Sequence, residues 1–253
     1  MKTIYFDNNA TTPIAPEVLD EMLPYLRELY GNPSSMHTFG GQLHRKIEEA
    51  RLRVAGLLGA GPEEIIFTSC GTESDNTALM SAVESVPHKK HIITSRVEHP
   101  AVLNFCKHLA RKGYRVTYLP VSKQGQLNVD ELVKALDEDT AVVSLMYANN
   151  ESGVIFPVAE LGEMLKERGI LFHTDAVQAV GKIPIDLKKL PVDMLSLSGH
   201  KLHAPKGVGA LYVRKGARFH PYIIGGHQEH GRRAGTENVA SIIALGKACE
   251  LAG

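Results

Sequence analysis

A lysine and an aspartate occupy positions where the sequence predicts that two strands end. Lys201 follows Leu195-Ser196-Leu197-Ser198, whose alternation of apolar and polar residues predicts a strand, and Gly199-His200, which predicts a turn. Asp175 follows the apolar run 170–172 and lies 26 positions before Lys201. Ligand sites in open α/β sheets lie beyond the carboxyl ends of the strands, so both side chains are expected at one edge. An amine there could form a Schiff base, and an acid could keep a ring nitrogen protonated.

A turn that could bind an anion is predicted upstream of both residues. The buried-strand run 64–68 precedes Gly71-Thr72 and a periodic stretch that predicts a helix. Thr72 is the expected N-cap of that helix, because Thr72 and Asp75 have the spacing of a capping box. Gly71 would let the backbone approach closely, and the free N–H groups of a helix N-terminus bind phosphate. Capping boxes are common, so this motif is a weak signal by itself and supports a ligand site only together with Lys201 and Asp175.

A histidine is predicted at a third strand end. Glu98-His99-Pro100 follows the predicted strand 90–95, and Pro100 suits the first turn of a helix that reaches residue 112. His99 is therefore expected at a strand-to-helix junction on the same edge of the sheet. Taken singly, a surface lysine, a capping aspartate and a structural histidine are the commoner explanations. Together with the anion-binding turn, the three residues favour a pyridoxal phosphate site.

The composition predicts a globular protein with one large core. The chain has 253 residues, of which 43% are hydrophobic and 22% charged, and 28 Lys and Arg balance 28 Asp and Glu. This neutrality argues against nucleic-acid and membrane-surface partners, and no apolar run approaches the length of a membrane span. Cys70, Cys106 and Cys249 have no CxxC spacing and predict no disulfide framework, which fits a reducing compartment such as the cytoplasm.

Strand-like and helix-like segments alternate through most of the chain. This predicts a doubly wound α/β fold, with a mostly parallel sheet of seven strands and helices on both faces. The predicted strands are 65–68, 91–95, 115–120, 141–146, 170–174, 193–197 and 208–213. Helices are predicted between many of them, at 72–83, 100–112, 128–136 and 157–168, with two N-terminal helices at about 16–30 and 40–58 and a last one at 241–251.

Motifs for other cofactors are incomplete. Gly59-Ala60-Gly61 and Gly207-Val208-Gly209 each begin a GxG but lack the third glycine of a dinucleotide fingerprint, and no Walker A motif occurs. The histidine pairs at 200/203 and 227/230 lie among glycines and prolines, which argues against a helix presenting either pair to a metal. No metal site is predicted.

Eight ordered strings, spread over essentially the whole chain, resemble those of the NifS-like cysteine desulfurases. These enzymes belong to the class V aminotransferase branch of the fold-type I pyridoxal-phosphate enzymes. The strings are Tyr5-Phe6-Asp7-Asn8-Asn9-Ala10-Thr11-Thr12, Gly31-Asn32-Pro33-Ser34-Ser35, Cys70-Gly71-Thr72-Glu73-Ser74-Asp75-Asn76, Glu98-His99-Pro100-Ala101-Val102, Ala148-Asn149-Asn150-Glu151-Ser152-Gly153, His173-Thr174-Asp175-Ala176-Val177-Gln178, Ser198-Gly199-His200-Lys201 and Arg232-Arg233-Ala234-Gly235-Thr236-Glu237-Asn238.

The resemblance implies a role for each candidate residue. Lys201 would be the Schiff-base lysine, His99 would stack on the ring and move protons, and Asp175 would pair with the ring nitrogen. Gln178 would bond the ring hydroxyl, and Asn150 would lie near the ring and the substrate carboxylate. The implied phosphate ligands are Gly71, Thr72, Ser198 and His200, together with Thr236 from the other subunit of a homodimer.

The implied reaction converts L-cysteine to L-alanine and passes the sulfur, as an enzyme persulfide, to an iron-sulfur scaffold protein. In the family, the acceptor cysteine and an arginine for the substrate carboxylate lie beyond the position of Gly253, in a smaller C-terminal domain. None of the three cysteines present matches that nucleophile. By this resemblance, residues 1–15 are an arm that starts the small-domain segment, and residues 16–253 are the cofactor-binding large domain of a truncated chain.

Two other classes of function stay open at this point. A selenocysteine lyase or a small-substrate aminotransferase would share Lys201, Asp175 and His99, and the products would distinguish them. A truncated chain could also serve as a non-catalytic scaffold for assembly partners, in which case no cofactor absorbance is expected.

Overall fold

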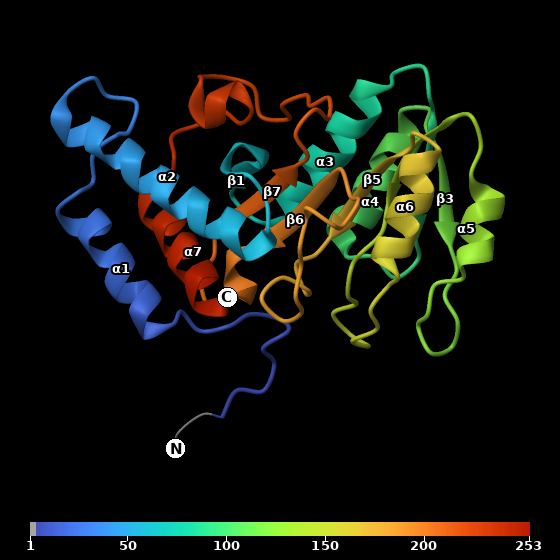
Figure 1. Ribbon diagram of the computed structural model, residues 1–253, viewed down its shortest axis with the longest axis horizontal. Helices are drawn as coiled ribbons and strands as arrows, with labels where there is room; N and C mark the ends of the chain where they lie inside the picture. Colours follow the sequence, from blue (N-terminus) through green and yellow to red (C-terminus); the bar gives the residue numbers. More distant parts are fainter. Residues whose placement is uncertain (1–3) are drawn as a thin grey trace.

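Seven short strands form one sheet in the computed structural model, which describes residues 4–253 (Figure 1). In chain order they are β1 (Ile65–Thr68), β2 (His91–Ser95), β3 (Arg115–Leu119), β4 (Thr140–Ser144), β5 (Leu171–Asp175), β6 (Met194–Ser198) and β7 (Gly209–Val213). All seven lie where the sequence predicts strands, and their ends differ from the predicted ones by no more than two residues.

The strand order is β1-β7-β6-β5-β4-β2-β3. β7 is antiparallel to both of its neighbours, and the remaining pairs are parallel. The prediction of a mostly parallel seven-stranded α/β sheet is therefore confirmed. The parallel strands point their carboxyl ends at one edge of the sheet, where the predicted site residues are expected.

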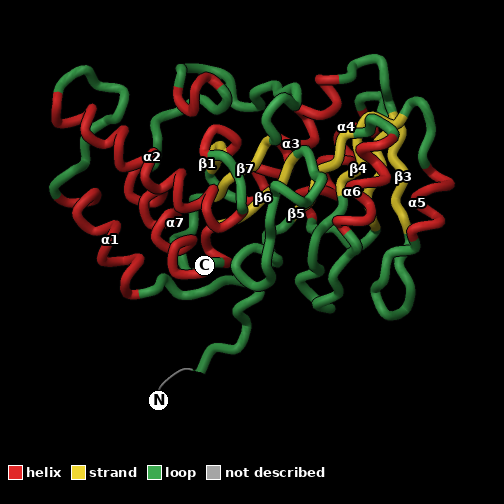
Figure 2. Tube along the Cα trace, in the orientation of Figure 1, coloured by secondary structure: helices red, strands yellow, loops and turns green. Residues whose placement is uncertain are grey.

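Helices cover both faces of the sheet (Figure 2). Because successive strand residues point to opposite faces, each face has its own apolar core. On one face, α3 (Gly71–Ser85) and α4 (Pro100–Arg111) pack against strand residues such as Ile66, Ile92 and Val142. The other face carries α1 (Pro16–Arg27), α2 (Thr38–Leu58), α5 (Val129–Ala135), α6 (Val158–Glu167) and α7 (Val239–Ala252).

The two predicted N-terminal helices pack together with the last helix. α2 and α7 approach closely at Gly246, where a Cβ atom would lie 2.6 Å from the Cα of Ala50. That contact requires glycine in α7, because no side chain fits between the two backbones. α1 packs against α7 as well, so the first and last helices of the chain share one apolar layer.

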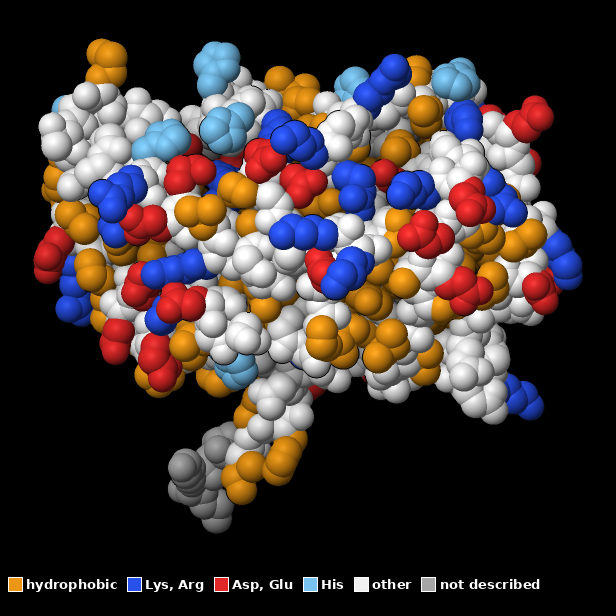
Figure 3. All heavy atoms as spheres, viewed as in Figure 1, with side chains coloured by type: hydrophobic (Ala, Val, Ile, Leu, Met, Phe, Trp, Pro, Cys, Tyr) orange, Lys and Arg blue, Asp and Glu red, His pale blue; other side chains and the backbone are white. Residues whose placement is uncertain are grey.

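Residues 4–15 form an extended arm with a turn at Asp7–Ala10. The backbone N–H of Thr12 donates to the carbonyl of His200 at 3.0 Å, which ties the arm to the segment after β6. The start of the arm projects from the lower edge of the molecule (Figure 3), and Phe6 is 90% exposed. Residues 1–3 of the predicted arm lie outside the described residues. Among residues 4–253, no helix combines the length and the apolar character needed to cross a membrane.

Candidate active site

A cavity of about 640 Å³ opens where β4, β5 and β6 end and where α3 and α4 begin. Nine of the ten predicted site residues line it: Gly71, Thr72, His99, Asn150, Asp175, Gln178, Ser198, His200 and Lys201. The tenth, Thr236, lies at a separate hollow of about 150 Å³ that Ser69 and Arg233 also line. The structure thus brings nine candidates together, and it leaves Thr236 outside the cavity of its own chain.

Lys201 closes a single 3₁₀ turn, Gly199–Lys201, directly after β6. Its Nζ donates to the backbone carbonyl of Ala10 at 2.8 Å and also to that of Asn9, both in the N-terminal arm. Burial lowers the pKa of the Lys201 amine, and the nearby carboxylates of Asp7 and Asp175 oppose that change. A lysine held this way is more often neutral than a surface lysine, which suits a nucleophilic amine.

Asp175 is the last residue of β5 and is 6% exposed. One carboxylate oxygen, Oδ1, accepts the backbone N–H of Val177 at 3.0 Å. Burial raises the pKa of Asp175, while this hydrogen bond and the positive charges of His99 and Lys201 lower it. A cation bound close to this carboxylate would therefore be strongly favoured, because little water screens the pair.

His99 is the N-cap of α4, as its place before Pro100 predicts. Its Nδ1 accepts the backbone N–H of Ala101 at 3.1 Å. In the neutral ring, the proton therefore resides on Nε2, and this atom remains available for proton transfer.

The N-terminus of α3 differs from the predicted capping box. The helix begins at Gly71, with Cys70 as an N-cap that makes no side-chain hydrogen bond, so the prediction of Thr72 as the cap is wrong. Asp75 faces the buried interior instead of turning back to Thr72, and the carboxylate of Glu73 accepts a backbone N–H from Ser69 at 2.8 Å. The uncapped first turn leaves N–H groups at the cavity, which suits an anion better than the predicted cap would.

Gly71 is required where α3 meets the ends of β5 and β6. A Cβ atom there would lie 2.9 Å from Cγ2 of Val177 and 3.4 Å from Cβ of Ser198. The small residue therefore lets the helix N-terminus approach the strand ends. His200 lies beside it, where its Nδ1 shares a 3.1 Å hydrogen bond with the Thr11 hydroxyl. Burial, with help from neighbouring lysines, lowers the pKa of His200.

The N-terminal arm supplies site contacts that the sequence patterns do not reveal. The Gln178 amide donates to the carbonyl of Asn9 at 2.9 Å, and the Asn9 amide donates to the carbonyl of Asn150 at 3.2 Å. Asp7 and Ala10 line the same cavity. No local pattern could have found these contacts, because the partners are separated by well over a hundred residues.

Three further titratable groups are buried at the cavity, Asp75 in its lining and Glu98 and His173 behind it, and the sequence predicts none of them as a site residue. Asp75 and Glu98 are 1% and 4% exposed, and His173 is fully buried. Burial raises the pKa of Glu98 to about 8 and lowers the pKa of His173 to about 3. Both residues belong to quoted strings, but only their depth in the fold shows that they are neutral at physiological pH.

Comparison with known proteins agrees with this architecture. The sequence model of the family described as "Aminotransferase class-V" matches residues 4–252. The cysteine desulfurase of Trichormus azollae is 62% identical over 251 residues, which are 99% of this chain and 63% of that protein. The structure of a NifS-like protein has a TM-score of 0.96 at 48% identity, covering 99% of this chain and 70% of that one. A structure titled "SspA in complex with cysteine" has a TM-score of 0.95 at 41% identity, covering 98% of this chain and 72% of that one.

The match extends over nearly all of this chain, which spans about 63% of the length of the curated relative. Its seven-stranded α/β sheet is the fold of these structural neighbours. The chain therefore belongs to the aminotransferase class-V family.

Proposed function

We propose that this chain is the cofactor-binding part of a pyridoxal-phosphate-dependent cysteine desulfurase, which converts L-cysteine to L-alanine and passes on the sulfur as a persulfide. The observation that carries the proposal is the meeting of Lys201, Asp175 and His99 in one cavity, beside an uncapped helix N-terminus. The relatives support it, since the T. azollae protein is a cysteine desulfurase and the SspA structure holds cysteine.

The residues present fit pyridoxal phosphate. The first turn of α3, with Ser198 and His200, offers donors for the phosphate, and Asp175 offers a buried carboxylate for a cationic ring nitrogen. Gln178 and Asn150 line the same cavity, and the Gln178 amide would donate to the ring hydroxyl. A cavity of about 640 Å³ is also within the range of small-molecule sites.

When bound, the cofactor supplies an aldehyde for exchange between amines and a ring that accepts the electrons released with the substrate α-proton. Lys201 contributes an amine whose pKa is lowered by burial, which favours the neutral form that can accept a proton. His99 keeps Nδ1 bonded to the Ala101 N–H, so Nε2 is the atom that would protonate or deprotonate the substrate sulfur. Asp175 holds a positive ring nitrogen through charge, because burial removes the water that would screen it.

The sulfur acceptor is proposed to lie outside residues 1–253. Burial raises the pKa of both Cys106 and Cys249 to about 12, so neither supplies a thiolate at neutral pH. Cys70 lines the cavity as the N-cap of α3, beside the helix N-terminus that is proposed to bind the phosphate. The three free cysteines also support a reducing compartment such as the cytoplasm.

The proposal includes a homodimer and an iron-sulfur scaffold protein as the final sulfur acceptor. Thr236 lies outside the cavity of its own chain, which is consistent with a role in the phosphate site of a partner subunit. The loop that carries Thr236 is anchored by a buried ion pair, in which Arg51 donates to Glu229 at 2.7 and 2.9 Å. That anchor gives the loop a fixed shape on the surface.

The test is covalent trapping of the cofactor. The chain is incubated with pyridoxal phosphate, reduced with borohydride and weighed intact by mass spectrometry. One reduced pyridoxyl group per chain, located at Lys201 by peptide mapping and absent from Lys201→Ala, is expected. Lys182→Ala serves as the control, because Lys182 also lies beside a site residue, bonded to Gln178 at 2.6 Å, and should not replace Lys201.

Addition of L-cysteine then tests the reaction class. No persulfide is expected on Cys70, Cys106 or Cys249 of this chain. Keto-acid formation would identify an aminotransferase, and a chain that fixes no pyridoxyl group would contradict the proposal.

A further inference from the structure

Two buried carboxyl groups line the cavity, and only one of them has a lysine among its charged neighbours. Asp175 ends β5, and Asp75 lies in the second turn of α3; both line the cavity. Lys201 and His99 are the basic neighbours of Asp175, and both lower its pKa. Among the described residues, no lysine or arginine forms an ion pair with Asp75. A negative charge on Asp175 raises the pKa of the buried Asp75, so ionisation of both carboxyl groups at neutral pH is disfavoured.

The surroundings of Asp75 do not support a negative charge. The side chain is 1% exposed, and its Oδ1 has no hydrogen-bond partner among the described residues. The closest basic atom is Nε2 of His173 at 3.6 Å, which is too long for a hydrogen bond. An ionised carboxylate without a partner in this position would be costly, whereas a neutral carboxylic acid is far less so.

His173 cannot supply the missing positive charge. Its Nδ1 is bonded to the Ser144 hydroxyl at 2.9 Å and its Nε2 to the Ser196 hydroxyl at 3.0 Å. Burial lowers the pKa of this imidazole to about 3, so the ring is neutral at physiological pH. The neutral His173 ring already has a serine hydroxyl bonded to each nitrogen. Asp75 therefore has polar groups beside it but no cation.

The other titratable neighbours of Asp75 add no positive charge. Glu98, from the turn after β2, and Cys70, from the turn before α3, both disfavour an ionised Asp75. The carboxyl of Glu98 accepts from the Ser95 hydroxyl at 2.6 Å and from the backbone N–H of Met146 at 3.1 Å. Burial raises the pKa of Asp75 well above its usual range, and the neighbouring Asp175 raises it further.

We propose that Asp75 is a positioning residue that keeps its proton at neutral pH and so leaves Asp175 as the single negative charge on the cavity floor. Asp175 is the member that ionises, because the Val177 N–H, Lys201 and His99 all stabilise its negative form. A bound ring nitrogen would then face a single negative charge, and that charge would have a fixed position on Asp175. That consequence for the cofactor rests on the proposed function, whereas the proton count of the two carboxyl groups does not.

The experiment measures unfolding by urea as a function of pH, without cofactor, for the unsubstituted chain and for Asp75→Asn. Asparagine has nearly the same shape and never ionises. Because Asp75 retains in the native state a proton that it releases in the unfolded state, the Asp75 contribution to the stability of the unsubstituted chain falls as pH rises above about 4, the ordinary pKa of aspartate. The ratio of its unfolding constant to that of Asp75→Asn should therefore rise by up to about tenfold per pH unit.

A double-substitution cycle tests the coupling between the two carboxyl groups. In an Asp175→Asn background the like charge is gone, so Asp75 should ionise at lower pH and the ratio should stop rising at lower pH. Asp130→Asn, which changes an exposed aspartate on α5, is the control for the substitution itself. A substitution that abolishes folding is recognised by the absence of a cooperative urea transition at every pH. The slopes of the unfolding-constant ratio against pH are compared among chains that unfold cooperatively.

Each outcome decides the proposal. A ratio that rises with pH supports it. A ratio that is constant or falls with pH would show that native Asp75 is ionised, and this would overturn it, as would a pH dependence that Asp175→Asn leaves unchanged. Borohydride trapping on the same unsubstituted chain is scored separately. If no pyridoxyl group is fixed, the proposed function fails while the pH result still reports on Asp75.

Discussion

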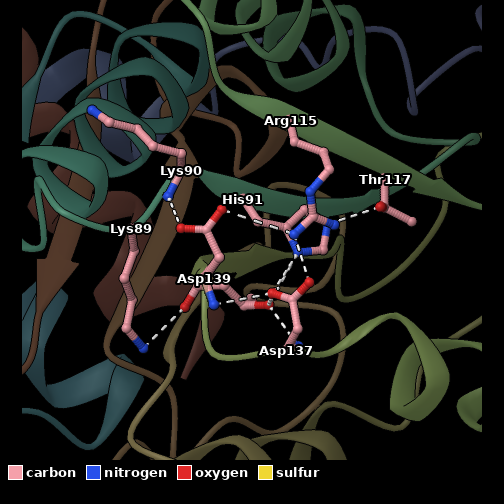
Figure 4. Close-up of polar contacts among 8 residues, drawn as sticks. Lys89, Lys90, His91, Arg115, Thr117, Asp137 and Asp139 are labelled. Carbon is pink, nitrogen blue, oxygen red and sulfur yellow. Dashed lines mark hydrogen bonds and ion pairs between the residues drawn. The ribbon is translucent and has the colours of Figure 1, made fainter.

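At the amino edge of the parallel strands, His91 is fully buried and bonded through both ring nitrogens (Figure 4). Nδ1 lies 3.1 Å from the Thr140 hydroxyl and 3.3 Å from Oδ1 of Asp137, and Nε2 lies 2.8 Å from the Thr117 hydroxyl. Figure 4 shows that Arg115 reaches the same carboxylate. At this edge every buried polar atom of these residues has a partner.

At the carboxyl edge, buried acidic side chains lack some of their hydrogen-bond partners. Oδ1 of Asp75 and Oε2 of Glu98 are buried without a hydrogen-bond partner among the described residues. Within residues 4–253, Lys201 donates to carbonyls of the arm and forms no ion pair. A buried polar network that is fully paired stabilises one fold, whereas unpaired groups mark a place where a ligand can supply the partner. The difference between the two edges therefore separates residues that hold the sheet from residues that bind.

Asp175→Asn tests the difference between the two edges most directly. Removing the charge at the carboxyl edge should weaken pyridoxal phosphate binding by roughly 30-fold or more, the size expected when one partner of a buried charge pair is lost. Equilibrium titration followed by absorbance measures the effect. Asp137→Asn at the amino edge is the matched control, and it should lower stability with little effect on affinity. Equal affinities for Asp175→Asn and the unsubstituted chain would remove Asp175 from the site.

The opposite result is expected for His91→Ala. It leaves the hydroxyls of Thr117 and Thr140 without their buried partner and opens a cavity, so the free energy of unfolding should fall by about 2–3 kcal/mol. Urea denaturation measures this change, and borohydride trapping of the folded fraction should be unaffected. A stable His91→Ala chain that has lost cofactor binding would show that the two edges are not independent.

Local patterns predict one part of this molecule well and another part poorly. Lys201, Asp175 and His99 were predicted at strand ends because strand alternation, turn glycines and Pro100 act within a few residues. The predicted Thr72 cap is wrong because the capping-box spacing considers neighbouring residues alone, whereas Asp75 is buried on the side of α3 that packs against β5 and β6. The neutral state of Asp75 and the contact of Lys201 with Asn9 depend on residues far apart in sequence, so no local signal carries them.

The two edges should nevertheless share one response to acid. For His173, a native pKa of about 3 lies below the ordinary value of about 6.5, so its contribution to stability is present above that value. The contribution is lost as pH falls from about 6.5 toward 3, by about 1.4 kcal/mol per pH unit. Burial also lowers the pKa of His91, which adds a loss of the same sign.

Urea unfolding of the chain and of His173→Asn over this pH range checks that slope. The variant should be less sensitive to acid by one proton, and His88→Asn, which changes an exposed histidine, should retain the full slope. Equal slopes for the chain and His173→Asn would mean that His173 is already protonated in the folded state.

The smallest effect is expected from Lys182→Met, which tests a site residue that is already paired. Lys182 donates to Oε1 of Gln178 at 2.6 Å. This bond fixes the orientation of the Gln178 amide, so that its Nε2 donates to the carbonyl of Asn9. Without the lysine, the amide is free to turn its oxygen toward the cavity, where it could not donate to a ring hydroxyl. Since an exposed contact of this kind contributes about 0.5–1 kcal/mol, cofactor affinity should fall by only about two- to fivefold. Lys90→Met at the amino edge removes the same charge and should leave the affinity unchanged. A loss as large as that of Asp175→Asn would mean that Lys182 binds the cofactor directly. Lys182 would then belong with the residues that bind, although its amine is already paired with Gln178.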